Sequence, residues 1–385
     1  MTVRFTTITS LLMLLWSSPL VLGTPGDEPQ PAATWPRVEP GIEYLHERIG
    51  AAPWSIHVVK IDRSQPRFQL VTALAQDHIY GLAPVTEQLE RVTTPTQRPV
   101  AAVNGDFFVI RPGPYQGDPL GLQIVNGRLV SAPTGEAFWM SPKGQPRIGA
   151  VQAAFRATGP DGLNLTFGLN EKCEPNAAVL YTPAVGASTR TTEGVELILE
   201  REGEGPWLPL RAAERYQARI AAVRTEGNTS LRPEIMVLSI GPELAQKLPA
   251  LTAGMTVSLD LETTPDLTDV TTALGAGRIL VREGQVSNLQ RYPHRHPRTA
   301  LGWNATHLFL VVVDGRQAGL SKGMNYTELS ALLLRLGCTE AINLDGGGSS
   351  TLWLDGQIIN SPSDGQPRRI ANSLIVVATE PKEQP

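Results

Sequence analysis

Residues 341–353 constrain the fold more than any other stretch, because an apolar strand pattern there runs directly into consecutive glycines. Asn343 and Asp345 alternate with apolar residues before the glycines, and hydroxyl side chains follow them. Glycine lets a backbone turn sharply or approach a ligand closely, and glycine-rich loops present N–H groups to anions. The stretch therefore predicts a strand that ends in an anion or sugar site. The plainer alternative is a flexible turn between two hairpin strands.

Composition limits the classes of function. The 385 residues are 41% hydrophobic, so the chain can bury the core of one large domain or two ordinary ones. A formal net charge of −4 gives no basic face for nucleic acid, so no nucleic-acid partner is expected. The many glycines and prolines, 36 and 32, favour a strand-rich protein with many turns.

The N-terminus predicts export. Arg4 precedes an apolar run from Ile8 to Leu22, which is short for a membrane span and resembles a secretory signal cleaved near Gly23. We therefore expect a signal peptide over residues 1–23, a Pro-rich linker over residues 24–40, and a secreted or periplasmic protein with no stable membrane span after cleavage. An uncleaved anchor is the alternative. Cys173 and Cys338 are as compatible with free thiols as with one disulfide.

The remainder, residues 41–380, is predicted to form one catalytic domain, in which residues 150–260 could be a β-rich insert. A helix is expected over residues 85–92 and another over residues 327–336. The second lies between apolar strands at 308–313 and 341–344, which predicts a β-α-β unit with parallel neighbouring strands. The predicted fold class is α+β: a large strand-rich mixed sheet core with a few helices, including this C-terminal β-α-β unit. Asp314 and Asp345 would then lie at one sheet edge, where ligands bind.

A second motif, residues 104–108, repeats the same pattern of an apolar strand followed by Asn104, Gly105 and Asp106. Such a strand end can place an amide and a carboxylate in a cleft, but Asn-Gly is also the strongest short hairpin signal. On the local sequence the two readings are equal. Farther along, Arg298 and Thr299 begin a strand, and an arginine there suits bidentate recognition of phosphate.

Taken together, these motifs resemble the phosphodiester glycosidase family. The matching pieces are residues 104–108, 298–302, 314–315 and 343–350, and the pair Arg369 and Asn372, in the same order and approximate spacing, whereas the central region matches only loosely. The resemblance implies hydrolysis of a sugar-1-phosphodiester at the anomeric C–O bond. The expected catalytic residues are Asp345, Asp314, Arg298, Asn343 and Asp106. The expected substrate-binding residues are Asn104, Gly105, Thr299, Gly346, Gly347, Gly348, Ser349, Ser350, Arg369 and Asn372.

Two other functions remain open from the sequence. A metal-dependent phosphodiesterase would use the same carboxylates and Asn343 to bind Ca²⁺ or Mg²⁺ and would cleave the P–O bond. A non-enzymatic cell-wall carbohydrate-binding module would use the same cleft without turnover. For the hydrolase itself no cofactor is required, although a divalent cation is compatible with it. The expected partner is a sugar-phosphate or cell-envelope glycan, and the sequence does not indicate an oligomeric state.

Overall fold

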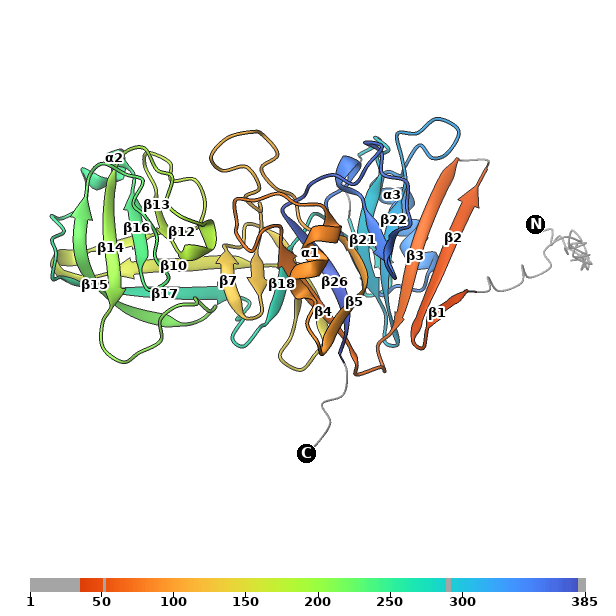
Figure 1. Ribbon diagram of the computed structural model, residues 1–385, viewed down its shortest axis with the longest axis horizontal. Coiled ribbons are helices and arrows are strands. Elements are labelled where there is room, and N and C mark those ends of the chain that lie inside the picture. Colours follow the sequence, from red (N-terminus) through yellow and green to blue (C-terminus); the bar gives the residue numbers. More distant parts are fainter. Residues whose placement is uncertain (1–34, 51–52, 289–291, 380–385) are drawn as a thin grey trace, which may run out of the picture. The chain divides into compact units, whose positions relative to one another are not determined.

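Strands rather than helices build this protein, as Figure 1 shows for the computed structural model, which describes residues 35–50, 53–288 and 292–379. Strand residues account for 44% of it and helical residues for 9%, and the sheets are mostly antiparallel. The predicted α+β class with a mixed sheet is therefore wrong, and the fold is mainly antiparallel β. The predicted signal peptide lies outside the described residues, as does most of the linker, of which Arg37–Glu39 forms a strand.

Sheet 1 carries the strands that precede the glycine motif. Its spatial order is β1-β2-β3-β22-β21-β23-β19-β20. These strands are β1 (Arg37–Glu39), β2 (Ile42–Ile49), β3 (Trp54–Asp62), β19 (Ile279–Arg282), β20 (Gln285–Val286), β21 (Arg298–Trp303), β22 (His307–Val313) and β23 (Glu340–Asn343). In this order β21 lies between β22 and β23 and pairs antiparallel with both.

The predicted pair of parallel neighbours, β22 and β23, is therefore not formed. The helix between them does form, as α3 (Tyr326–Arg335), with Asn325 as N-cap in a capping box with Glu328. Gly302 of β21 lets the helix lie close to the sheet, since a Cβ there would sit 3.2 Å from Leu333 Cδ2. The helical spacing of apolar residues predicted this helix correctly. This local spacing contains no information about β21, the strand earlier in the chain that separates β22 from β23.

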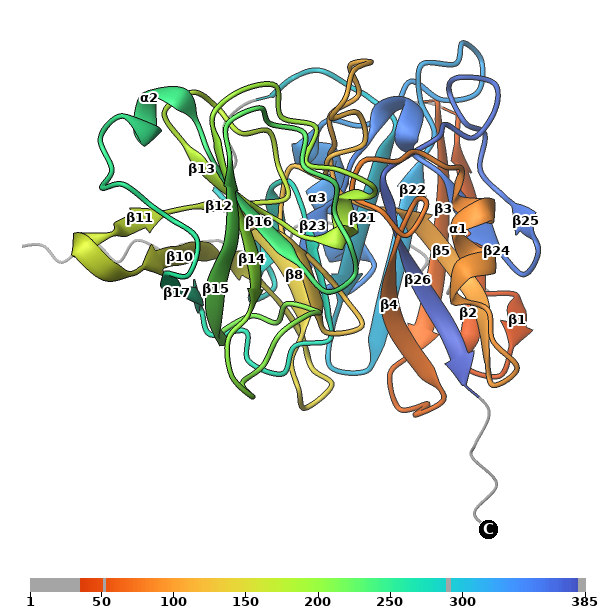
Figure 2. The same cartoon turned by 60° about the vertical axis from the view of Figure 1, so that its left-hand side comes forward.

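Sheet 2 brings the second motif beside the first. Its order is β25-β24-β5-β26-β4. The strands are β4 (Phe68–Leu74), β5 (Gln97–Asn104), β24 (Leu352–Leu354), β25 (Gln357–Ile358) and β26 (Asn372–Thr379). Because β5 ends at Asn104 and β24 begins just after the glycines, their antiparallel pairing places the two motifs together. The predicted helix α1 (Val85–Val92) lies over this sheet (Figure 2). Its buried residues Val85 and Leu89 belong to one apolar cluster with Ala102 and Ile375 of the sheet.

The other two sheets are formed largely by the middle of the chain. Sheet 3, in the order β7-β6-β18-β8-β9, consists of β6 (Gln123–Val125), β7 (Arg128–Ser131), β8 (Glu136–Met140), β9 (Pro146–Ala150) and β18 (Thr272–Gly275). Sheet 4, in the order β11-β10-β17-β15-β14-β16-β13-β12, consists of β10 (Gln152–Thr158), β11 (Asn164–Thr166), β12 (Gly168–Leu169), β13 (Ala178–Tyr181), β14 (Val195–Arg201), β15 (Arg215–Arg224), β16 (Met236–Ile240) and β17 (Thr256–Thr264). The short helix α2 (Pro242–Ala245) follows β16.

Sheet 4 thus uses only strands from the stretch expected to be a β-rich insert. Its apolar face packs in one cluster with residues of sheet 3, among them Ile124 and Leu129. A second cluster joins sheets 1, 2 and 3 through residues such as Leu310, Leu374 and Leu274. That residues 150–260 form a β-rich insert in the catalytic domain stays a prediction. No helix of the described residues has the length and apolar character needed to cross a bilayer.

Candidate functional site

Asn104 joins the two motifs through its buried side chain, which is 1% exposed. Its Oδ1 accepts hydrogen bonds from Thr299 Oγ1 at 2.7 Å and from the backbone N–H of Thr351 at 3.2 Å. Its Nδ2 donates to the backbone oxygen of Asp345 at 2.7 Å. Both the oxygen and the nitrogen of this side-chain amide therefore form hydrogen bonds with other groups of the protein. Asn104 closes β5 as a structural link between strands and is not the tip of a hairpin.

Asp345 lies two residues after the end of β23 and is partly exposed. Its Oδ1 accepts a hydrogen bond from Gly346 N at 2.7 Å. Burial raises the pKa of this carboxyl, while hydrogen bonds from Ser349 and Gly346 and the charges of Arg368 and Arg316 oppose the rise. The carboxyl therefore stands between an apolar interior that favours its neutral form and cations that favour its ionised form.

Asp106 is the more deeply buried carboxyl, with 4% of its surface exposed. Its Oδ1 accepts a hydrogen bond from Phe107 N at 2.7 Å, whereas Oδ2 has no partner among the described residues. Burial, and then the charge of Asp345, raise its pKa to about 7, and the nearby backbone N–H groups of Phe107 and Gly121 oppose this rise. Protonation of Asp106 near neutral pH is therefore coupled to the charge on Asp345, because a negative charge there favours the neutral form of Asp106.

Glycines make the room that Asp106 occupies. A Cβ on Gly275 would lie 2.2 Å from Asp106 Oδ2, and a Cβ on Gly121 would lie 2.8 Å from it. A Cβ on Gly105 would similarly lie 2.1 Å from Asn372 Oδ1, the atom that accepts a hydrogen bond from Asp106 N at 2.7 Å. The buried carboxyl is thus enclosed by backbone that no larger residue could form without displacement.

Two arginines that the sequence reasoning missed lie against the glycines. A Cβ on Gly347 would be 3.0 Å from Arg316 Nη2, and a Cβ on Gly348 would be 1.9 Å from Arg368 Nη2. Arg368 also donates to Ser349 Oγ at 3.5 Å and forms an ion pair with Asp364 at 2.7 Å. Both guanidinium groups therefore border the loop where phosphate binding was predicted.

The arginines that were predicted have other partners. Arg298 is 5% exposed, donates from Nε to Met324 O at 2.8 Å and stacks 4.2 Å from the centre of the Tyr326 ring. Burial lowers its pKa. Arg369 is exposed and donates to Leu82 O at 2.7 Å, with Glu87 3.4 Å away. Neither contact set includes a residue of the glycine loop.

Asp314, which is 1% exposed, lies in a separate hydrogen-bonded network behind the loop. Its Oδ2 accepts from Ser55 Oγ at 2.8 Å and lies 3.0 Å from His57 Nε2, while its Oδ1 accepts from Asn360 Nδ2 at 3.1 Å. Burial acts to raise its pKa, but hydrogen bonds and charge from His57, and hydrogen bonds from Ser55 and Asn360, leave it lowered. An ionised Asp314 therefore supports the loop through Asn360, which also donates to Ser350 O at 3.1 Å.

Several buried polar atoms of the motifs lack partners among the described residues. Asn343 is fully buried; its Nδ2 donates to Leu344 O at 2.6 Å, and its Oδ1 has no partner. Buried polar groups are rarely left in this state, so each marks a place where a polar ligand or water can bind. The other such atoms at this junction are Asp106 Oδ2, Ser350 Oγ, Thr351 Oγ1, Asn372 Nδ2 and Ser373 Oγ.

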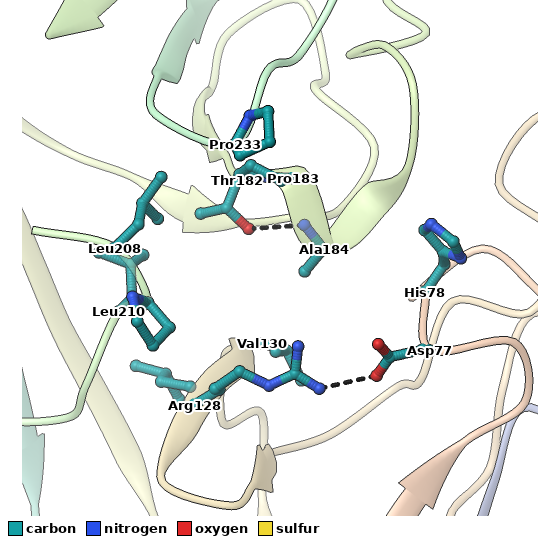
Figure 3. Close-up of a pocket in the computed structure, with 12 residues that line it drawn as sticks. Asp77, His78, Arg128, Val130, Thr182, Pro183, Ala184, Leu208, Leu210 and Pro233 are labelled. Carbon is teal, nitrogen blue, oxygen red and sulfur yellow. Dashed lines mark hydrogen bonds and ion pairs between the residues drawn. The ribbon is translucent and has the colours of Figure 1, made fainter. Parts of the chain in front are cut away.

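A cavity of about 420 Å³ lies elsewhere, and Figure 3 shows it with the ion pair between Arg128 and Asp77 at one side. Its walls include three leucines and three prolines, and no motif residue lines it.

Among the described residues no group of three or more His, Cys, Asp and Glu side chains is arranged to hold a metal ion. Cys173 and Cys338 are free thiols.

Comparison with known proteins supports the resemblance seen in the motifs. Residues 219–377 match the model of the phosphodiester glycosidase family, a range that includes the glycine loop and both bordering arginines but not Asp106. A Bacillus subtilis protein, the SPbeta prophage-derived YomE, is 39% identical over 83 residues, which is 21% of this chain and 13% of the relative. The Bos taurus N-acetylglucosamine-1-phosphodiester alpha-N-acetylglucosaminidase is 40% identical over 96 residues, or 23% of this chain and 18% of that protein.

The matched segments are thus a small part of these relatives' own lengths. Among solved structures, a Synechocystis protein covers 88% of this chain, and 62% of that chain is matched, with a TM-score of 0.68 and 21% sequence identity. This likeness shows a shared fold.

The carboxyl pair predicts a characteristic pH dependence of stability. Because the folded-state pKa of Asp106 lies near 7 and its ordinary value is 3.8, folding favours the protonated form. The contribution of Asp106 to the free energy of unfolding should therefore be largest below about pH 4. This contribution should fall as the pH rises to about 7. Asp106→Asn should flatten this fall, as urea unfolding across that range would measure. Asp118→Asn, at another buried carboxyl with a raised pKa, is the control for a general effect of buried acids. An unchanged slope in Asp106→Asn would contradict the assignment.

Proposed function

Because residues 219–377 carry the phosphodiester glycosidase signature, we propose that this chain hydrolyses sugar-1-phosphodiesters by breaking the anomeric C–O bond. The observation that carries the proposal is the meeting of two carboxyls of raised pKa, Asp106 and Asp345, at a glycine loop bordered by Arg316 and Arg368. This set supplies what the reaction needs: cations for the phosphate and acid–base groups for the sugar carbon. We also propose, on the same basis, that a sugar-1-phosphodiester is the substrate of the whole protein.

In the proposed complex the phosphate lies over the loop. The guanidinium groups of Arg316 and Arg368 hold its oxygens, and backbone N–H groups of residues 346–350 add to them. A phosphate monoester is a stable leaving group, so the departing oxygen needs little protonation. Most of the chemical work therefore falls on the carboxylate that faces the anomeric carbon.

We assign that carboxylate to Asp345, because it is partly exposed and lies beside the arginines that favour its ionised form. Asp106 is more buried and has the higher tendency to hold a proton near neutral pH. Two carboxyls whose surroundings separate their protonation in this way are the usual basis for distinct roles in glycoside chemistry. Asp106 would carry a proton near neutral pH, while Asp345 acts as nucleophile or as base toward water.

The roles of the other predicted residues change in this proposal. Asn104, Thr299 and Asp314 act by holding the loop and the carboxyl pair in place, and Arg298 acts through the loop that precedes β21. Asn343, Asn372 and Ser350 retain unpartnered polar atoms, which suits them to bind sugar hydroxyls. Export by an N-terminal signal is also proposed, and it would direct the enzyme to envelope or extracellular glycans, lipid-linked sugar phosphates or teichoic-like polymers.

The bond that breaks can be identified with labelled water. Hydrolysis of a panel of sugar-1-phosphodiesters in ¹⁸O-water should place the label on the sugar, and Asp345→Ala should lower kcat at least about a hundredfold. Mass spectrometry of both products is the measurement. Label on the phosphate, with loss of activity in chelator, would instead establish a metal-dependent phosphodiesterase. Binding without turnover of any substrate would establish a carbohydrate-binding module.

The neighbouring arginines Arg368 and Arg369 provide a matched test of the phosphate contact. Arg368→Ala should raise KM for a sugar-1-phosphodiester about ten- to a hundredfold, because a charged hydrogen bond to phosphate is lost. Arg369→Ala should have a much smaller effect, since its side chain is paired with Glu87 and Leu82 O. Steady-state kinetics of the two variants would decide, and a larger effect for Arg369 would contradict the assignment.

A further inference from the structure

A histidine outside the proposed catalytic set touches one of the two loop arginines. His296 Nδ1 lies 3.2 Å from Arg316 Nη2, and Arg316 in turn lies against Gly347. On the other side of the ring, Nε2 lies 3.4 Å from the hydroxyl of Tyr292. His296 is thus the side chain between the glycine-loop arginine and an aromatic surface residue.

Elementary chemistry fixes the direction of the first contact. Arginine can only donate hydrogen bonds, so His296 Nδ1 must accept the bond from Arg316. The ring must then be neutral and carry its hydrogen on Nε2, where it can donate to the Tyr292 hydroxyl. A protonated ring would present an N–H to a guanidinium and would lose this contact.

The backbone around His296 is held firmly enough for the ring to orient a neighbour. His296 and Met324 exchange backbone hydrogen bonds of 3.2 and 3.0 Å. Arg298 binds Met324 O on the same segment and stacks on Tyr326, while Tyr292 packs 5.6 Å from Tyr326 between ring centres. The buried guanidinium of Arg298 thereby supports the loop that carries His296.

Arg316 itself needs such support. It has a positive φ of 60°, which is unusual for a residue with a side chain, and that side chain is largely exposed. A long exposed arginine loses conformational freedom when it is fixed to bind an anion. Among the described residues, His296 is the one hydrogen-bond partner of the Arg316 guanidinium, so this contact is what orients the guanidinium over Gly347.

We propose that neutral His296 is a positioning residue, which holds Arg316 over the glycine loop ready to receive the phosphate of the substrate. This proposal rests on the proposed phosphate site and specifies how that site depends on pH. It also gives a role to the second histidine of the segment 294–296, which forms no metal cluster with other described residues.

The surroundings of His296 keep it in the required form near neutral pH. Burial lowers its pKa, and the positive charges of Arg298, Arg316 and His294 lower it further. Tyr292 faces the ring as well, through its hydroxyl. The Nδ1 atom of His296 can therefore accept the hydrogen bond from Arg316 at neutral pH but not in acid. Once His296 is protonated, Arg316 should no longer be held in position, and phosphate should bind more weakly.

The proton position on His296 can be measured without any substrate. Nitrogen-15 NMR of the full chain should show the Nε2–H tautomer for His296, and its pKa should lie below the ordinary histidine value of 6.5. Arg316→Gln should raise the His296 pKa, because a positive charge is removed. A hydrogen on Nδ1 at neutral pH, or a His296 pKa unchanged by Arg316→Gln, would overturn the proposal even if the enzyme is active.

Binding of inorganic phosphate, followed by calorimetry, tests the consequence for the site. His296→Ala should weaken binding about two- to tenfold, the effect of one hydrogen bond, and His296→Gln should restore it because the amide oxygen can accept from Arg316. His294→Ala is the matched control and should bind as the unaltered protein does. Equal loss in His296→Gln and His296→Ala would overturn the positioning role. If the unaltered protein fails to bind phosphate, the proposed phosphate site fails, and the NMR result alone then decides whether His296 orients Arg316.

Discussion

The buried amide of Asn104 is the contact on which the arrangement of this site depends. Its hydrogen bonds reach Thr299 on β21, the backbone before β24 and the carbonyl of Asp345. Asn104 ends β5 of sheet 2 and Thr299 lies on β21 of sheet 1, whereas the other two groups lie in the connection between β23 and β24. One side chain thus fixes the junction where the two sheets meet. Removing one partner of a buried hydrogen bond leaves the others unsatisfied, which is costly. The link therefore determines where Asp345 lies relative to Asp106, two residues beyond Asn104.

Opposed electrostatic effects give the junction its chemistry. Burial favours the neutral form of both carboxyls, and the arginines beside the glycine loop favour the ionised form of Asp345. Asp314 shows the contrasting case, since hydrogen bonds from Ser55, His57 and Asn360 keep its pKa low although only 1% of its surface is exposed. Three aspartates that follow similar strands thus differ in protonation because their partners differ. Of these three aspartates, the two at the glycine loop have the raised pKa values expected of acid–base groups.

The sequence predicted the local features well, because they depend on neighbouring residues. The helix over residues 85–92 and the strand that ends at Asn104 follow from spacing and turn residues. The two motifs also meet, which the local sequence of residues 104–108 left open because a hairpin turn fitted it equally well. The fold class was not predictable in the same way, since nothing near residues 308–344 indicates that β21 separates β22 from β23.

The arginines illustrate the same limit at the level of single side chains. Arg368 and Arg369 are adjacent, and successive residues in extended chain point to opposite sides. The sequence could not indicate which one faces the loop. Arg316 follows the Asp-Gly pair that was recognised, so extending that motif by one residue would have found it. The partners of Asp314, Ser55 and His57, lie more than two hundred residues away in sequence, where no local pattern connects them.

A crystal structure of Asp345→Asn with a bound sugar-1-phosphate would test the central claim most directly. The substitution preserves shape while removing the charge of the proposed catalytic carboxylate. The account predicts a phosphate within hydrogen-bond distance of Arg316, Arg368 and the N–H groups of residues 346–350, with the anomeric carbon facing residue 345. A phosphate bound instead at Arg369 or in the cavity beside Arg128, with the glycine loop free of ligand, would contradict it.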